Sequence, residues 1–238
     1  MNENKTIIIG HRGAPIDAGS ENSLESFGKA IELGADMIEF DVRKTKDNIL
    51  VTYHDPKIDV YRLSDLTCNQ ANELIREKRS RIPKLSEVLE FTDGRIDLDI
   101  ELKEPGYEHE VLKLLDRHYH SGEYIITSFK EQILSRIKKL STESKVGLLI
   151  GVQNLFCPNC RVFSFSSRVN CVPADCLVLH WSLLRFGILK RLMKESIPVI
   201  VWTVNDTKML RYLLSQNIKG IITDHVSLAA APTLVSSS

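Results

Sequence analysis

Long apolar runs and an excess of charge of either sign are both absent from this sequence. Lysine plus arginine and aspartate plus glutamate each number 31 among 238 residues, so the formal net charge is zero. A neutral chain has no overall field that attracts nucleic acid or an anionic membrane, so local groups must bind any anionic ligand. A membrane-spanning helix needs roughly 20 consecutive apolar residues, and no stretch approaches this length. We therefore expect neither a nucleic-acid partner nor stable membrane insertion.

Cysteine is scarce as well, with five residues. The first apolar run, Ile7-Ile8-Ile9, is too short for a secretory signal and no cleavage pattern follows it, so we expect a cytoplasmic protein with mostly reduced thiols. Cys157-Pro158-Asn159-Cys160 has the spacing of a zinc knuckle, but Cys171 and Cys176 are further apart than a second pair should be. Free thiols in a loop are the preferred interpretation, and structural zinc is the alternative.

Short β-branched runs alternate with helical patterns, which is typical of parallel strands joined by crossover helices. Strands are predicted at Thr6–Gly10, Met37–Val42, Ile96–Leu102, Tyr124–Thr127, Val146–Ile150, Cys176–Leu179, Val199–Thr203 and Gly220–Thr223. Helices are predicted at Leu24–Leu33, Leu85–Phe91, Glu108–His118, Glu131–Leu140, Leu183–Glu195 and Met209–Ser215. Eight strands are the number that a (β/α)8 TIM barrel requires, so we predict an α/β fold of this type.

The chain shows no internal repeat, and one barrel domain over residues 1–238 accounts for its length. Two stretches fit the alternation less well, 48–80 and 156–175, and are interpreted as insertions over the carboxyl-end face of the barrel. The Ala/Ser-rich tail, 226–238, is expected to be frayed. Asn22 is predicted to cap the first helix, with Glu25 completing a capping box.

Charged residues alternate with apolar ones in the second predicted strand. Glu39 and Asp41 share one face, and Ile38, Phe40 and Val42 share the other. Because helices cover the apolar face, the two carboxylates should point into the barrel. Surface carboxylates are the ordinary interpretation of such a pattern, but the strands of a barrel have no solvated face. Buried negative charges need a compensating cation, so the pattern favours a metal site.

Four charged residues fall on one face of the third predicted strand: Asp97, Asp99, Glu101 and Lys103. Active sites of these barrels lie at the carboxyl ends of the strands, so Glu101 and Lys103 should reach the site, whereas Asp97 and Asp99 lie deeper or at the base. Three carboxylates, with neither a cysteine nor a clear histidine partner, suit a hard cation such as Mg²⁺ or Ca²⁺. The alternative is a structural ion-pair network with Arg12 and Lys103.

Two histidines are predicted at the mouth of the barrel. His11 and Arg12 follow the first strand directly, and Gly13 allows a sharp turn or a close approach to a ligand. A single histidine there is more often structural, but His54 ends another apolar run and supplies a second imidazole. Two histidines can divide base and acid roles near neutral pH. Arg12 can bind phosphate oxygens through two nitrogens, and Lys103 adds a point charge.

Motifs in the first part of the chain match one known family in identity and spacing: His11-Arg12-Gly13, Glu21-Asn22-Ser23, Phe27, Ala30, Gly34-Ala35-Asp36, Glu39, Asp41, Thr45-Lys46-Asp47 and His54-Asp55. Later motifs match it too: Ile82-Pro83-Lys84-Leu85, Glu101-Leu102-Lys103, Ser128-Phe129, Trp202-Thr203-Val204-Asn205 and Ile222-Thr223-Asp224. In these motifs, over nearly its whole length, the chain resembles the glycerophosphodiester phosphodiesterase family.

The resemblance implies a distorted (β/α)8 barrel that cleaves small-molecule glycerophosphodiesters into sn-glycerol 3-phosphate and an alcohol such as choline, ethanolamine or glycerol, with bound Mg²⁺ or Ca²⁺. By matching positions, Glu39, Asp41 and Glu101 would ligate the metal. His11 and His54 would form the acid/base pair.

The resemblance also implies substrate contacts. Arg12 and Lys103 would hold the phosphate, Trp202 would line the pocket, and Glu21 would orient Arg12. The nucleophile is either water or the substrate's own glycerol hydroxyl, and the sequence leaves open which histidine is the base. The oligomeric state is also left open.

The segment Asp59–Asp65 departs from the Arg-Thr-Thr-type run that the family commonly has, and this leaves the substrate preference open. Asn48 stands where glycine is usual, and asparagine tolerates a left-handed turn. A lysophospholipase D acting on lipid-like diesters is a second hypothesis, which needs an apolar groove; Trp181 and Leu183 could line one, although core packing is the preferred interpretation. A catalytically silent binding barrel is a third hypothesis, against which the complete set of site residues argues.

Overall fold

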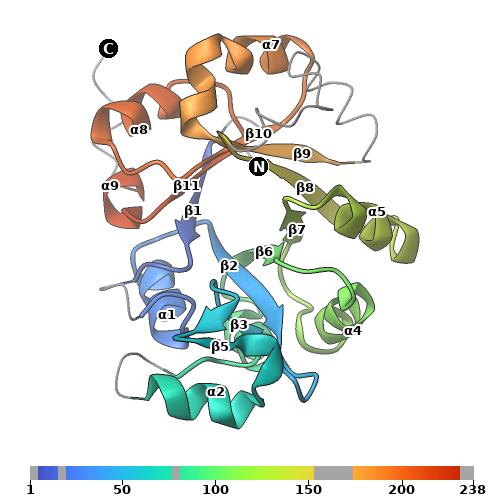
Figure 1. Ribbon diagram of the computed structural model, residues 1–238. Coiled ribbons are helices and arrows are strands. Elements are labelled where there is room, and N and C mark those ends of the chain that lie inside the picture. Colours follow the sequence, from blue (N-terminus) through green and yellow to red (C-terminus); the bar gives the residue numbers. More distant parts are fainter. Residues whose placement is uncertain (1–4, 16–19, 77–80, 153–173, 231–238) are drawn as a thin grey trace.

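The computed structural model describes residues 5–15, 20–76, 81–152 and 174–230. Its main sheet is a closed parallel barrel, in which β2 (Met37–Lys44) pairs with both β1 (Ile7–His11) and β6 (Asp97–Leu102) (Figure 1). The other strands complete the ring: β7 (Tyr124–Ser128), β8 (Lys145–Ile150), β9 (Cys176–His180), β10 (Val199–Trp202) and β11 (Gly220–Thr223). The predicted (β/α)8 barrel and its eight strands are confirmed.

Helices cover the outside of the barrel: α1 (Leu24–Glu32), α3 (Leu85–Thr92), α4 (Glu108–His118), α5 (Glu131–Leu140), α7 (Ile188–Lys194), α8 (Thr207–Leu214) and α9 (Val226–Ala230). The helix predicted from Leu183 is divided, because Gly187 takes a left-handed φ of 67° between the 3-10 helix η3 (Trp181–Phe186) and α7. The tail expected to fray from Val226 begins instead with helix α9, in which Val226 and Ala229 are buried. No described helix has the length and apolar character needed to cross a bilayer.

Alternation along each strand divides the apolar residues between two layers. Ile38, Phe40 and Val42 of β2 face the covering helices and belong to the large core cluster. Met37, on the opposite face of β2, packs in a smaller cluster inside the barrel with Ile125 and other inward residues. Glu39 and Asp41 share the inward face with Met37, so the strand directs its carboxylates into the barrel as the alternation predicts.

The first predicted insertion is a small unit attached to β2. β3 (Leu50–Thr52) pairs antiparallel with the end of β2, and β4 (Lys57–Ile58), β5 (Tyr61–Arg62), η1 (Leu63–Asp65) and α2 (Cys68–Ile75) follow (Figure 1). This unit has its own apolar cluster around Val51, Tyr53 and Leu63. Asn48 turns the chain into β3 with a φ of 61°, the left-handed conformation predicted for it.

The cysteine-rich stretch lies mostly outside the described residues, and so do Cys157, Cys160 and Cys171. Cys68 and Cys176 are free and buried. Burial raises the pKa of the Cys176 thiol to about 12, which keeps it protonated at neutral pH. The structure therefore does not test a zinc site built from all four cysteines.

Candidate active site

The loop after β1 has an unusual backbone that brings Arg12 to the mouth of the barrel. Arg12 has a φ of 54° and Gly13 a φ of 90°, so two successive residues are left-handed. A Cβ at Gly13 would lie 2.6 Å from the backbone carbon of Ser26, so only glycine fits against the start of α1. The backbone N–H of Arg12 donates to Glu39 Oε2 at 3.0 Å, which connects this loop to β2.

His11 is held by a carboxylate from the opposite end of the chain. Its Nδ1 lies 2.7 Å from Oδ1 of Asp224, the residue that follows β11, and its Nε2 lies 4.0 Å from Glu39 Oε2. Burial opposes ionisation of Asp224, but the hydrogen bond and charge of His11 outweigh it and lower the pKa of that carboxyl. If Nδ1 carries the proton, Asp224 fixes the ring so that Nε2 faces the site.

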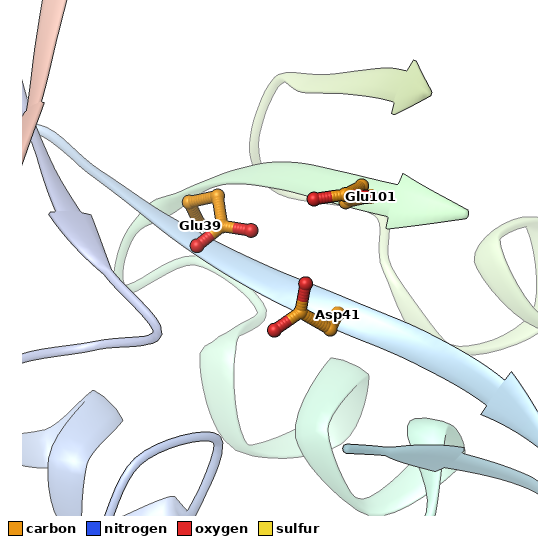
Figure 2. Close-up of side chains that lie close together, drawn as sticks. All are labelled: Glu39, Asp41 and Glu101. Atoms are coloured by element: carbon orange, nitrogen blue, oxygen red, sulfur yellow. The ribbon is translucent and has the colours of Figure 1, made fainter. Parts of the chain in front are cut away.

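Three buried carboxylates lie together on β2 and β6 (Figure 2). Asp41 and Glu101 are register neighbours on these strands, and one oxygen from each of Glu39, Asp41 and Glu101 lies within 4.8 Å of the other two. Burial and the neighbouring acids raise the pKa of Glu39 well above its usual range, and burial raises that of Glu101 to about 7. This crowding of negative charge is what a divalent cation would relieve.

Two cations lie against the carboxylate cluster. Lys103 Nζ is 2.8 Å from Asp41 Oδ1 and 2.7 Å from Glu101 Oε1. Arg12 Nε is 3.3 Å from Asp41 Oδ2, while its Nη1 donates to Glu21 at 2.7 Å. Burial opposes ionisation of Asp41, but Lys103 and Arg12 outweigh it and hold the pKa of Asp41 well below its usual range. The ion pairs predicted as the alternative to a metal are therefore present beside the candidate ligands.

His54 approaches the same site from the insertion. It follows β3, and the preceding residue, Tyr53, donates its backbone N–H to the carbonyl of Asp41 at 3.0 Å. The ring Nδ1 of His54 lies 2.8 Å from Asp55 Oδ1, and the His54 carbonyl accepts from Arg43 Nε at 2.8 Å. Burial lowers the pKa of His54, which favours the neutral imidazole.

A cavity of about 250 Å³ contains most of these side chains: His11, Arg12, Glu39, His54, Glu101, Lys103 and Trp202. Asp41 and Glu21 contact the cavity residues Lys103 and Arg12. The structure thus brings all nine predicted site residues together. A larger cavity of about 910 Å³ lies at the opposite end of the strands, around Lys5, Asp97 and Lys219, and contains none of them.

Apolar and aromatic residues form the other wall of the cavity. The Trp202 ring packs edge-on against Phe129, with centroids 5.5 Å apart, and against His180 at 5.1 Å. The indole N–H of Trp202 donates to the carbonyl of Val178 at 3.1 Å, which holds the ring in place. Leu183 is fully buried in the core between strands and helices, so core packing, the preferred interpretation for this residue, is confirmed.

Asn22 contacts a site residue and does not form the helix cap predicted for it. Ser23, not Asn22, caps α1, and it forms the capping box with Ser26 rather than with Glu25. Asn22 has a φ of 55° and exchanges two hydrogen bonds with Asp41: its Nδ2 donates to Oδ2 at 2.9 Å, and its Oδ1 accepts from the Asp41 N–H at 3.0 Å. Asn22 therefore fixes the orientation of a candidate metal ligand.

Asp99 of β6 lies at the floor of the cavity and is the register partner of Glu39 on β2. Its Oδ1 accepts from Thr127 Oγ1 at 2.7 Å, and its Oδ2 has no hydrogen-bond partner in the described part of the chain. Burial raises the pKa of Asp99 to about 7. This position agrees with the prediction that Asp99 lies deeper in the barrel than Glu101.

Comparisons with known proteins agree with this fold and site. The model of the glycerophosphoryl diester phosphodiesterase family matches residues 11–228. A glycerophosphodiester phosphodiesterase of Caldanaerobacter subterraneus subsp. tengcongensis is 31% identical over 242 residues, which cover 92% of this chain and 94% of that protein. The crystal structure of a glycerophosphodiester phosphodiesterase from Thermotoga maritima, 30% identical, superposes with a TM-score of 0.77 over 94% of this chain and 96% of that one.

A more distant structure, an Oleispira antarctica phosphodiesterase solved with the product sn-glycerol-3-phosphate, is 21% identical with a TM-score of 0.81, and 98% of each chain is covered. At this identity it supports the fold alone. The barrel, its charged mouth and the matched relatives define the class of the protein, which is a phosphoric diester hydrolase. Within that class, the chain belongs to the glycerophosphoryl diester phosphodiesterase family.

Proposed function

We propose that this enzyme hydrolyses glycerophosphodiesters to sn-glycerol 3-phosphate and an alcohol, with a divalent cation and two histidines. One observation carries the proposal: two histidines, two cations and the candidate metal ligands Glu39 and Glu101 line one cavity of about 250 Å³ at the carboxyl ends of the strands. The matching family model and the 31% identical glycerophosphodiester phosphodiesterase support the same reaction.

Glu39, Asp41 and Glu101 fit a hard divalent cation such as Mg²⁺ or Ca²⁺. They offer oxygen ligands, they converge within 4.8 Å, and burial raises the pKa values of Glu39 and Glu101, an effect that a bound cation would oppose. Asn22 and Lys103 fix Asp41 in place. When bound, the cation would neutralise charge on the phosphoryl oxygens.

The protein's own groups account for the other steps. Arg12, oriented by Glu21, holds a phosphoryl oxygen, and Lys103 adds a second positive charge. Because burial favours its neutral form, His54 is the base that takes the proton from the attacking hydroxyl, which belongs to water or to the substrate's glycerol. Attack by the glycerol hydroxyl would give a cyclic phosphate, which a water molecule then opens to glycerol 3-phosphate. His11, oriented by Asp224, donates a proton to the alcohol oxygen as its bond to phosphorus breaks.

The test is release of glycerol 3-phosphate from glycerophosphocholine, glycerophosphoethanolamine and glycerophosphoglycerol, with EDTA and with each divalent metal restored. We expect EDTA to abolish hydrolysis, and Mg²⁺ or Ca²⁺ to restore it in the wild type but not in Glu101→Ala. Full activity without metal would refute the ligand assignment, and no release under any condition would favour a silent binding barrel. Lysophosphatidylcholine is assayed beside the panel by release of choline, and a preference for it would instead support the lysophospholipase D hypothesis.

A further inference from the structure

A second cavity, of about 440 Å³, lies between the end of β2, the β4–β5 hairpin and the loop that follows β6. Figure 1 shows the hairpin beside the carboxyl end of β2. Basic residues contribute much of its lining: Arg43, Lys44, Lys57 and Arg62. Glu104 is the acidic residue in the lining. Because the basic residues outnumber it, we call this space the basic cavity.

Most of this positive charge has no acidic partner among the described residues. Glu104 pairs with Arg43, and this leaves Lys44, Lys57 and Arg62 facing the cavity. Lys57 and Arg62 are register partners in the hairpin, and no carboxylate of the described residues lies within ion-pair distance of either. Since the whole chain has no net charge, this local excess of cations stands out as a site for an anion.

The basic cavity adjoins the active site. Arg43 follows Asp41 on the inward face of β2, and its Nε donates to the carbonyl of His54 at 2.8 Å. Two consecutive residues line the two cavities: Lys103 lines the active-site cavity, and Glu104 lines the basic cavity. A group attached to the substrate on the side of His54 therefore extends towards the basic cavity.

The size of the active-site cavity is compatible with such an extension. Its volume of about 250 Å³ is below the roughly 300–1,000 Å³ of typical ligand pockets, so it suits the glycerophosphate portion rather than a whole diester. Among the described residues that line the active-site cavity, those around Trp202 and Phe129 are apolar or aromatic and offer no counter-charge to an anionic head group. On the other side, beyond His54, Lys44, Lys57 and Arg62 line the basic cavity without an acidic partner in the described part of the chain.

We propose that the basic cavity binds a phosphate group carried by the alcohol portion of the substrate, so that the enzyme favours glycerophosphodiesters with a phosphorylated head group. This inference rests on the proposed glycerophosphodiester hydrolysis. Arginine and lysine together match phosphate better than a zwitterionic or neutral alcohol, because guanidinium donates two parallel hydrogen bonds to its oxygens.

The test compares two substrates that differ by one phosphate, glycerophosphoinositol 4-phosphate and glycerophosphoinositol, by release of glycerol 3-phosphate. The wild type should show at least about a tenfold higher kcat/KM for the phosphorylated substrate, equivalent to one charge-assisted contact. Lys57→Glu/Arg62→Glu should reduce kcat/KM for the phosphorylated substrate at least about tenfold and change that of the other less than about twofold. Lys113→Glu/Lys139→Glu, at exposed positions on α4 and α5, is the charge-matched control and should leave the preference intact.

Each outcome has one interpretation. A selective loss in the hairpin variant supports the proposal, and raised salt should weaken the wild-type preference in the same direction. Equal loss for both substrates would assign the hairpin to folding or catalysis and overturn it. No loss, or no wild-type preference, would also overturn it while leaving the proposed hydrolysis intact. Failure to cleave either substrate, or any other glycerophosphodiester, would instead refute the proposed function.

Discussion

The two walls of the active-site cavity are built from different kinds of residue. Strands β1, β2 and β6 and the loops after them supply charged groups, including Glu39, Glu101 and Lys103. Strands β7, β8, β10 and β11 or the loops after them supply Phe129, Leu149, Trp202 and Ile222, which are apolar or aromatic. Under the proposed function, the two walls divide the labour: the charged wall performs the chemistry and the apolar wall positions the substrate.

The charged wall is energetically the less favourable of the two. Its buried acids repel one another, and the pKa values of Glu39, Asp99 and Glu101 are all raised. The apolar wall joins the small inner cluster around Ile125 and Val178, which stabilises the barrel by ordinary packing. Substitutions on the two walls should therefore affect different measurable quantities.

The largest effect is expected on the charged wall. His11→Ala and His54→Ala should each reduce kcat at least about 100-fold, because each removes a proton-transfer group. The measurement is steady-state hydrolysis of glycerophosphocholine, with circular dichroism to verify folding. His118→Ala is the matched control, since His118 pairs with Glu90 on the outer helices and should retain full activity. A loss below about tenfold in either site variant would contradict the assigned roles.

An intermediate effect is expected on the apolar wall. Trp202→Ala should raise KM about tenfold and change kcat by less than about threefold, because it removes contact area that ground state and transition state share. Tyr212→Ala, which removes an exposed aromatic ring from α8, should change neither constant. If Trp202→Ala instead lowered kcat alone, the proposed division between the walls would be wrong.

The smallest effect concerns stability. Because the pKa of Asp99 is about 7 in the fold and 3.8 for the ordinary group, the folded state binds its proton more tightly. That contribution to the free energy of unfolding is present at low pH and is lost as the pH rises from about 4 through 7. In EDTA, Asp99→Asn should reduce the loss of stability between about pH 5 and 8 by about 1 kcal/mol or more, measured by urea unfolding. Asp116→Asn, at an exposed position, should leave the loss unchanged; an unchanged slope in Asp99→Asn would contradict the buried-acid interpretation.

The barrel was predictable from sequence because its signals are local. Each strand is a short β-branched run, and alternation along Met37–Lys44 already separates the helix-facing residues from the carboxylates. Two local predictions failed, where Gly187 interrupts the helix expected from Leu183 and where Val226 begins a helix rather than a frayed tail. A left-handed glycine and the docking of α9 on the barrel are decided by tertiary packing, which overrides local propensity.

The partners of the site residues were less predictable. Asp224 orients His11 across 213 positions of sequence separation, and no periodic pattern encodes such a contact. Asn22 was predicted to be a helix cap because asparagine is common at N-cap positions. Its side chain forms hydrogen bonds with Asp41 instead. Both residues lay within motifs that carried the family resemblance, so the resemblance marked the positions but not their contacts.

The left-handed backbone of Arg12 has a consequence for how this enzyme can change. A non-glycine residue in that conformation costs roughly 1 kcal/mol or more relative to glycine, and Arg12 accepts the strain while its side chain reaches Glu21 and Asp41. Glycine would relieve that strain, but it would remove both ion pairs and leave the buried charge of Asp41 less compensated. The first loop of the barrel is therefore a place where the preference of the backbone and the needs of the buried carboxylates oppose each other.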